Sequence, residues 1–136
     1  MEAIRILIAD DADVIRHTLC KLLEREVGMK VVGEAANGAQ AVLKAVELRP
    51  DVVLMDADMP ELDGIEATRR IRTLDLPSKI IILTVIGSRL FEALSAGASE
   101  YLLKDCSRAA LVDKIRQAAA EIRCPAARQD KAQSAQ

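Results

Sequence analysis

Short apolar runs recur along the chain and are separated by longer segments with a different hydrophobic spacing. The runs are rich in valine and isoleucine, and several are nearly continuous, which is typical of strands covered on both faces of a sheet. They are IRILIA (4–9), KVVGEAA (30–36), DVVLM (51–55), KIIILT (79–84) and EYLLK (100–104). We therefore predict five β-strands.

The segments between these runs have the spacing of amphipathic helices. In the first of them, Ile15 is followed by leucines at i+4, i+7 and i+8, which places four apolar side chains on one helix face. Gly97 is a natural stop for the fourth helix. The predicted helices cover residues 13–26, 39–48, 64–74, 89–96 and 107–122.

The alternation of strand and helix predicts an α/β fold, in which a doubly wound parallel sheet carries helices on both faces and the crossovers are right-handed. With 136 residues, of which 51% are hydrophobic and 29% charged, the chain fits one globular domain. In such folds the ligand crevice lies outside the carboxyl ends of the strands, where the winding reverses. The residues at the strand ends are therefore the candidates for function.

Carboxylates stand at two of these strand ends. Asp10 and Asp11 follow the first run, and Asp56 and Asp58 follow the third. If the first and third strands are neighbours, three carboxylates meet in one crevice. Two such charges about 4 Å apart repel by roughly 4 kcal/mol at an effective dielectric near 20, so the site requires a raised pKa or a cation. An all-oxygen ligand set suits Mg²⁺ or Mn²⁺.

Two further residues extend this site. Thr84 ends the fourth run and Lys104 ends the fifth, which adds a hydroxyl donor and a mobile cation. These groups fit phosphoryl transfer, in which the protein positions the reactants and neutralises charge on the transferring oxygens. The Asp56 carboxylate is the candidate nucleophile, and its attack on phosphorus would give an aspartyl phosphate.

Taken jointly, these segments resemble the receiver domain of two-component response regulators. The matching features are the acidic pair after the first strand, LMDADMPELDG (54–64), the threonine that closes the fourth strand, and AGASEYLLKD (96–105). They cover nearly all of residues 4–122. The resemblance implies a flavodoxin-like (βα)5 fold with strand order 2-1-3-4-5.

The resemblance also implies a role for each site residue. Asp56 would be the phospho-acceptor, and Lys104 would contact the phosphoryl group. Thr84 and Tyr101 would form a switch pair. The Mg²⁺ or Mn²⁺ ligands would be Asp10, Asp11, Asp56 and the main-chain carbonyl of Asp58.

A receiver of this kind would take its phosphoryl group from a sensor histidine kinase or a small phosphodonor, and would catalyse only its own phosphorylation and dephosphorylation. It would signal through the face made by the fourth helix, fifth strand and fifth helix, and that face, or the first and fifth helices, would be available for a homodimer. YLLKD (101–105) and GIEATRRIR (64–72) look most like receivers that precede a helix-turn-helix DNA-binding domain.

We expect residues 1–123 to form the receiver and residues 124–136, in which small and polar residues follow Pro125, to form a linker or disordered tail without an output domain. A stand-alone receiver and a receiver separated from its output domain both remain open. In the second case the regulation of transcription would require the missing domain.

Composition disfavours several other classes. The net charge of −2 provides no basic field for nucleic acid or membrane, so DNA would be reached only through an output domain. The N-terminus does not resemble a signal peptide, and no apolar run approaches the roughly 20 residues that span a bilayer. Three cysteines without metal-ligand spacing fit reduced thiols, and we expect a cytoplasmic protein without membrane contact.

The main alternative is an enzyme. The pair Asp56 and Asp58 also resembles the nucleophile and acid–base pair of haloacid-dehalogenase-like phosphatases. That motif, however, normally closes the first strand, and the chain is short for such an enzyme. A flavin- or nucleotide-binding module is weaker still, because no glycine-rich phosphate loop follows any strand.

Two residues near the site have simpler interpretations. Asp11 or Asp13 alone fits the cap of the first helix, and we expect Asp13 to be the cap and Asp11 to belong to the site. Val85 follows Thr84 where the family has a smaller residue, and its branched side chain is expected to narrow the access to Asp56.

Overall fold

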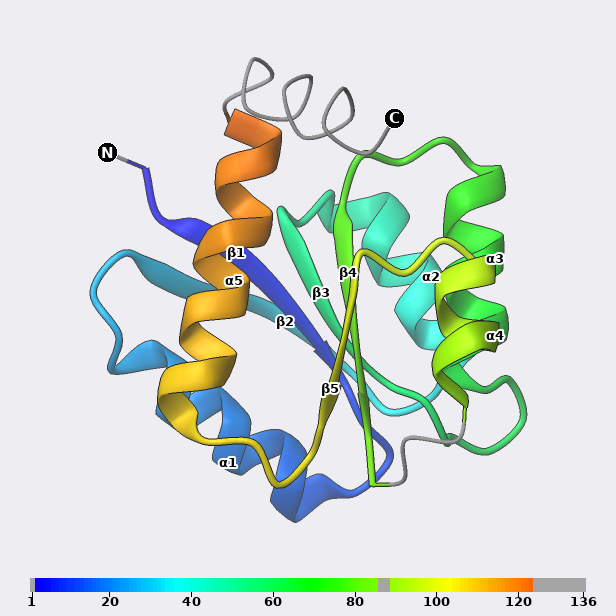
Figure 1. Cartoon of the computed structure of the whole chain (residues 1–136), viewed down its shortest axis with the longest axis horizontal. Helices are drawn as coiled ribbons and strands as arrows, with labels where there is room; N and C mark the ends of the chain where they lie inside the picture. The colour runs from blue at the N-terminus through cyan, green and yellow to red at the C-terminus, as the bar shows by residue number, and fades with distance from the viewer. Residues whose placement is uncertain (1, 86–88, 124–136) are drawn as a thin grey trace.

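The computed structural model describes residues 2–85 and 89–123, and it contains a five-stranded parallel sheet in the order β2-β1-β3-β4-β5 (Figure 1). This confirms the predicted fold class and strand order. The strands are β1 (Ile4–Ala9), β2 (Met29–Ala35), β3 (Val52–Asp56), β4 (Lys79–Thr84) and β5 (Glu100–Leu103). The helices are α1 (Asp13–Glu24), α2 (Gly38–Leu48), α3 (Gly64–Thr73), α4 (Leu90–Ser95) and α5 (Arg108–Arg123).

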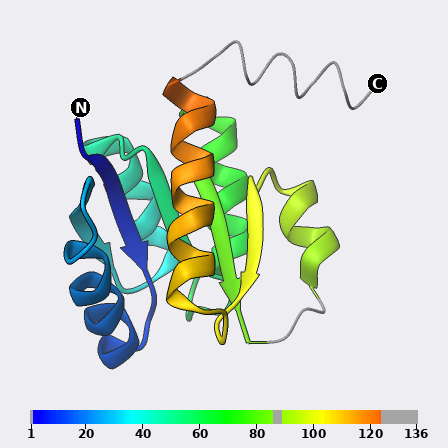
Figure 2. The same cartoon turned by 60° about the vertical axis from the view of Figure 1, so that its left-hand side comes forward.

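Helices cover both faces of the sheet, α1 and α5 on one side and α2, α3 and α4 on the other (Figures 1 and 2). Side chains alternate between the faces along a strand. In β3, Val53 and Met55 pack toward α2, α3 and α4, whereas Val52 and Leu54 pack toward α1 and α5. All five residues of β3 are buried, as the continuous apolar runs predicted.

The winding of the sheet reverses at β1. Its two neighbours are β2 and β3, so the chain moves to one side of β1 and then returns to the other. Ala9 pairs with Met55 in the register of β1 and β3. Because the strands are parallel, the residues that follow these two positions emerge side by side at the carboxyl edge, which is where ligands bind in such folds.

The predicted cap of α1 is wrong. The N-cap is Ala12, which makes no side-chain cap hydrogen bond, and Asp13 is the first residue of the helix. The Asp13 carboxylate instead accepts a hydrogen bond from Arg16 at 2.6 Å. The turn before the helix is closed by Asp10, whose carboxylate accepts a hydrogen bond from the Ala12 amide at 2.9 Å. Asp10 therefore stabilises the turn before α1, and the predicted capping role of Asp13 is not found.

Most of the helical face predicted for α1 is confirmed, since Leu23 is buried and Leu19 and Leu22 pack against the same core cluster. The buried residues of α1 are Cys20 and Leu23, whereas Ile15 is 41% exposed. In α5, Leu111 and Ile115 are buried against the sheet. The observed ends of the other elements differ from the predicted ones by one or two residues, which is the usual uncertainty of such boundaries.

The helix α4 is short, from Leu90 to Ser95, and the residues of the preceding segment at 86–88 lie outside the described part of the chain. Val85, just before them, is 73% exposed, and its effect on the access to Asp56 stays a prediction. No helix among the described residues is long and apolar enough to cross a membrane.

Candidate functional site

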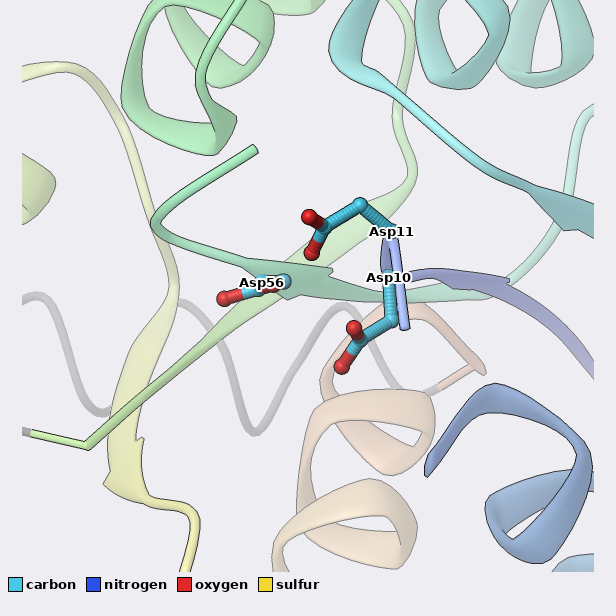
Figure 3. A group of neighbouring side chains, drawn as sticks. All are labelled: Asp10, Asp11 and Asp56. Carbon is cyan, nitrogen blue, oxygen red and sulfur yellow. The ribbon is translucent and has the colours of Figure 1, made fainter. Parts of the chain in front are cut away.

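Three aspartates converge at the carboxyl edge of the sheet (Figure 3). Asp10 and Asp11 follow β1, and Asp56 is the last residue of β3. One carboxylate oxygen from each lies within 4.8 Å of the others. Asp10 and Asp56 are 1% and 4% exposed, whereas Asp11 is exposed to solvent. The arrangement therefore has two buried carboxylates at its base and one at its mouth.

Lys104 provides a cation at this site. Its Nζ lies 3.0 Å from Asp10 Oδ2 and 3.2 Å from Asp56 Oδ1. The chain positions it through the Lys104 amide, which donates to the carbonyl of Thr84 at 2.7 Å. Burial lowers the pKa of Lys104, but the contacts with Asp10 and Asp56 outweigh this effect, so its pKa is raised and the ammonium stays charged.

The surroundings of Asp56 disfavour the charged form of its carboxyl. Burial and then the charge of Asp10 raise its pKa from 3.8 to about 6, against the opposing effects of the Asp58 amide, which donates to Asp56 Oδ1 at 3.2 Å, and of Lys104. One ammonium does not balance three carboxylates. A hard divalent cation with oxygen ligands fits both the donor set and the missing charge, so these residues are suited to Mg²⁺.

Thr84 and Tyr101 lie on neighbouring strands. Thr84 ends β4 and is buried, and Tyr101 is half-buried in β5 against the core between the sheet and α2, α3 and α4. Tyr101 pairs with Ile82, two residues before Thr84. Alternate residues of a strand share a face, so Thr84 and Tyr101 are on the same face of the sheet.

The Asp58 side chain points away from the aspartate cluster. It is 67% exposed, and its Oδ1 lies 3.2 Å from Nη1 of Arg89. The same guanidinium contacts Asp63 at 3.3 Å and Glu92 at 3.1 Å. The sequence analysis missed Arg89, because a single arginine before a short helix gives no signal and Asp58 is 31 positions away.

A surface groove lies beside Asp10 and Lys104. It has a volume of about 240 Å³ and runs between α1 and the start of α5. Asp10 and Lys104 line it together with apolar side chains, among them Ile15, Leu19 and Leu22. The exposed Ile15 of α1 therefore lines the same groove as Asp10 and Lys104.

The fold and the site define the class of protein. Residues 6–116 match the family model of the response regulator receiver domain. The chain belongs to this family and is a receiver domain of the two-component response regulators. The resemblance inferred from the acidic strand ends and the lysine of the fifth strand is thereby confirmed.

Curated relatives include transcription regulators and enzymes that carry such a domain. The transcriptional regulatory protein LiaR of Bacillus subtilis is 45% identical over 118 residues, which are 85% of this chain and 56% of that protein. A protein-glutamate methylesterase/protein-glutamine glutaminase of a Nocardioides species is 44% identical over 108 residues, 76% of this chain and 30% of that protein. The chain thus spans about half or less of the length of these relatives.

Solved structures agree with the fold. The signal receiver domain of the putative response regulator NarL from Mycobacterium tuberculosis has a TM-score of 0.84 at 30% identity, covering 88% of this chain and 98% of that one. The CheX–CheY–BeF3–Mg²⁺ complex from Borrelia burgdorferi contains a similar chain, with a TM-score of 0.75 at 26% identity, covering 89% of this chain and 90% of that one.

The phosphatase interpretation is not supported. The family is that of receivers. The geometry also disfavours it, since an acid that protonates a leaving group must face the nucleophile, whereas the Asp58 carboxylate is exposed and paired with Arg89.

Proposed function

We propose that this receiver accepts a phosphoryl group on Asp56 with the help of Mg²⁺ or Mn²⁺. The observation that carries the proposal is the buried Asp56 carboxylate beside Asp10 and Asp11, with the Lys104 ammonium 3.2 Å away. In this reaction an Asp56 oxygen attacks phosphorus of a phosphohistidine or acyl phosphate. The bond from phosphorus to the donor nitrogen or oxygen breaks, and the donor leaves with its electron pair.

The residues around Asp56 have separate roles in this proposal. Asp10, Asp11, Asp56 and the main-chain carbonyl of Asp58 would hold the metal ion. When bound, the metal neutralises negative charge on the phosphoryl oxygens. Lys104 contacts another phosphoryl oxygen and exchanges its present contact with Asp56 for that one. The base of the site is buried, which strengthens these charge interactions.

Thr84 and Tyr101 would convert the modification into a change of shape. Phosphorylation adds about −1.5 to −2 charges at Asp56. The Thr84 hydroxyl then turns toward the phosphoryl oxygens, and Tyr101 turns inward on the same face of β4 and β5. The exposed apolar side chains of α4, Leu90 and Phe91, support the surface of α4, β5 and α5 as the one that signals and is available for a homodimer.

The donor in the cell would be a sensor histidine kinase. The groove between α1 and the start of α5 supports this partner, because it gives an apolar docking surface that reaches Asp10 and Lys104. We also propose a cytoplasmic location, where such a kinase presents its phosphohistidine.

The output would be the regulation of transcription. The transcription regulators among the relatives support this proposal, as does the share of their length that this chain leaves unmatched. Residues 1–123 would form the receiver, and residues 124–136 a linker or tail. The chain itself would not contact DNA or a membrane.

The test is phosphorylation in vitro. The protein is incubated with acetyl phosphate and Mg²⁺ and its intact mass is measured, beside Asp56→Asn and the control Asp75→Asn, which changes an exposed aspartate away from the cluster. We expect one phosphoryl group on the wild type and on the control, none on Asp56→Asn, and none in EDTA. An adduct that persists in Asp56→Asn would contradict the assignment, and steady release of phosphate without an adduct would indicate a phosphatase.

A further inference from the structure

Arg89 joins two loops at the mouth of the acidic site. Its guanidinium contacts Asp58 and Asp63, which lie in the segment between β3 and α3, and Glu92 in the first turn of α4. We call Arg89 and these three acids the Arg89 cluster. Arg89 is itself the N-cap residue of α4 and makes no side-chain cap hydrogen bond there. Its side chain therefore links the start of α4 to the segment that follows Asp56.

The rest of α4 has few buried contacts. Ala93 is its one buried residue, followed by Ala96 at the C-cap, whereas Phe91 is 83% exposed and Leu94 is 48% exposed. Two alanine side chains bury little apolar area. The Arg89 cluster thus adds polar contacts to a helix that has few apolar ones of its own.

The cluster is also close to Asp56 along the chain. The Asp58 amide donates to Asp56 Oδ1 at 3.2 Å, and the Asp58 carboxylate contacts Arg89. A change of charge on Asp56 therefore acts on Asp58, two residues away, whose carboxylate contacts the Arg89 guanidinium. The guanidinium has a planar set of donors that matches phosphate oxygens.

The contacts of the cluster are weak enough to be exchanged. The Asp58 and Glu92 side chains are 67% and 58% exposed, and ion pairs at such exposure are screened by water and salt. A phosphoryl group, with a charge of about −1.5 to −2 and three acceptor oxygens, would compete with these carboxylates for the guanidinium.

We propose that Arg89 is a positioning residue that fastens α4 to the segment after β3 in the unphosphorylated protein, and that phosphorylation of Asp56 draws it away from Asp63 and Glu92 and frees the start of α4. The inference rests on the proposed function, because it needs the phosphoryl group on Asp56. It adds a second way in which phosphorylation of Asp56 would change the protein, through the ion pairs of Arg89, beside the one through Thr84 and Tyr101.

The test measures hydrogen–deuterium exchange of peptides that contain α4, before and after treatment with acetyl phosphate and Mg²⁺. Intact mass taken in parallel reports the phosphorylated fraction. The proteins are the wild type, Arg89→Gln, Arg89→Lys, and the control Arg69→Gln, which removes an exposed arginine that pairs with Glu66 within α3.

We expect phosphorylation to speed exchange in α4 of the wild type and of Arg69→Gln by about threefold or more, as local release of a weakly held helix predicts. In Arg89→Gln, the α4 peptides should already exchange at this faster rate without phosphorylation. Phosphorylation should then change their exchange little. Arg89→Lys, which keeps the charge and loses the planar donor set, should be intermediate. Asp58→Asn, which leaves the contact of Arg89 with Asp63, should be intermediate, and adding it to Arg89→Gln should give no further increase.

Two results would overturn the proposal. One is equal exchange of α4 in unphosphorylated wild type and Arg89→Gln. The other is an equal response to phosphorylation in both proteins, which would leave Arg89 a structural role only. If intact mass shows no adduct on the wild type, the proposed function fails, and the fastening of α4 is then judged by the two unphosphorylated proteins alone.

Discussion

At the scale of single residues, the protein keeps a carboxylate where it is electrostatically unfavourable. Asp56 is buried beside Asp10, and its pKa is raised to about 6 although Lys104 lies 3.2 Å away. In the unfolded chain this carboxyl titrates near its ordinary value of about 3.9. The charged form of Asp56 thus lowers the stability of the metal-free protein. An aspartate at this position is therefore explained by function and not by stability.

The sign of this effect gives a pH dependence. Between pH of about 4 and 6 the folded protein holds a proton on Asp56 that the unfolded chain has lost, so the contribution of Asp56 to stability falls as the pH rises and is least favourable above pH 6. We expect Asp56→Asn to be more stable than the wild type at pH 8 in EDTA, by an amount on the order of 1 to 3 kcal/mol. The difference should shrink at pH 5.

Urea unfolding followed by circular dichroism at the two pH values measures this difference, and it suits a chain without tryptophan. Asp75→Asn, an exposed aspartate, is the control and should differ little from the wild type at either pH. A wild type that is more stable than Asp56→Asn at pH 8, or a difference that does not vary with pH, would contradict the electrostatic argument.

At the scale of elements, the site depends on how closely α3 begins to the end of β3. Asp63 caps α3 by accepting a hydrogen bond from the Glu66 amide at 2.8 Å. The next residue, Gly64, donates from its amide to the carbonyl of Ala57 at 3.0 Å. A Cβ at Gly64 would lie 1.9 Å from the carbonyl oxygen of Asp56. Glycine is thus required for the close approach of these two backbones.

We therefore expect Gly64→Ala to displace the end of β3 and the start of α3. It should lower the free energy of unfolding by about 2 kcal/mol or more, since backbone atoms rather than a flexible side chain must move. It should also slow phosphorylation of Asp56 by acetyl phosphate. Urea unfolding and the time course of intact mass measure the two effects.

Gly33→Ala is the matched control. Its new Cβ would meet the Cδ1 atom of Leu48 at 2.6 Å, which is the end of a flexible side chain that can rotate away. We expect a smaller loss of stability there and a normal rate of phosphorylation. Equal effects of the two substitutions would argue against the special role of Gly64.

At the scale of the whole molecule, the parallel sheet gathers charges that are far apart in sequence. Lys104 and Asp10 are separated by 94 positions, yet they meet at 3.0 Å. The folded state alone assembles the three carboxylates, so a metal ion that binds them binds the folded state and stabilises it by mass action.

We expect Mg²⁺ to raise the melting temperature by about 3 to 8 °C at ten times its dissociation constant. Thermal unfolding by circular dichroism, with NaCl at equal ionic strength as the control, measures this shift. EDTA should abolish it, and Asp11→Asn should shift it to higher Mg²⁺ concentrations because one oxygen ligand is lost. An equal shift with NaCl would show that screening, and not binding, is responsible.

The local pattern of apolar and polar residues along the chain was enough to predict the strands, the helices and their arrangement. Continuous apolar runs and helical spacing report burial directly, and they predicted every strand and helix of the described residues to within one or two positions. The cluster at the sheet edge was also predictable, because the carboxyl ends of parallel strands meet at one edge and Asp10, Asp56 and Lys104 stand at such ends.

The sequence by itself thus determined the fold and the charged base of the site, whereas the tertiary structure decided which side chains close the turns and join the loops. It left α1 without the predicted Asp13 cap, closed the turn before this helix with Asp10, and brought Arg89 to Asp58. The physical reason is that burial periodicity is a property of neighbouring residues in one element. A capping or ion-pair contact depends on distances between elements, which exist only after the helices have packed on the sheet.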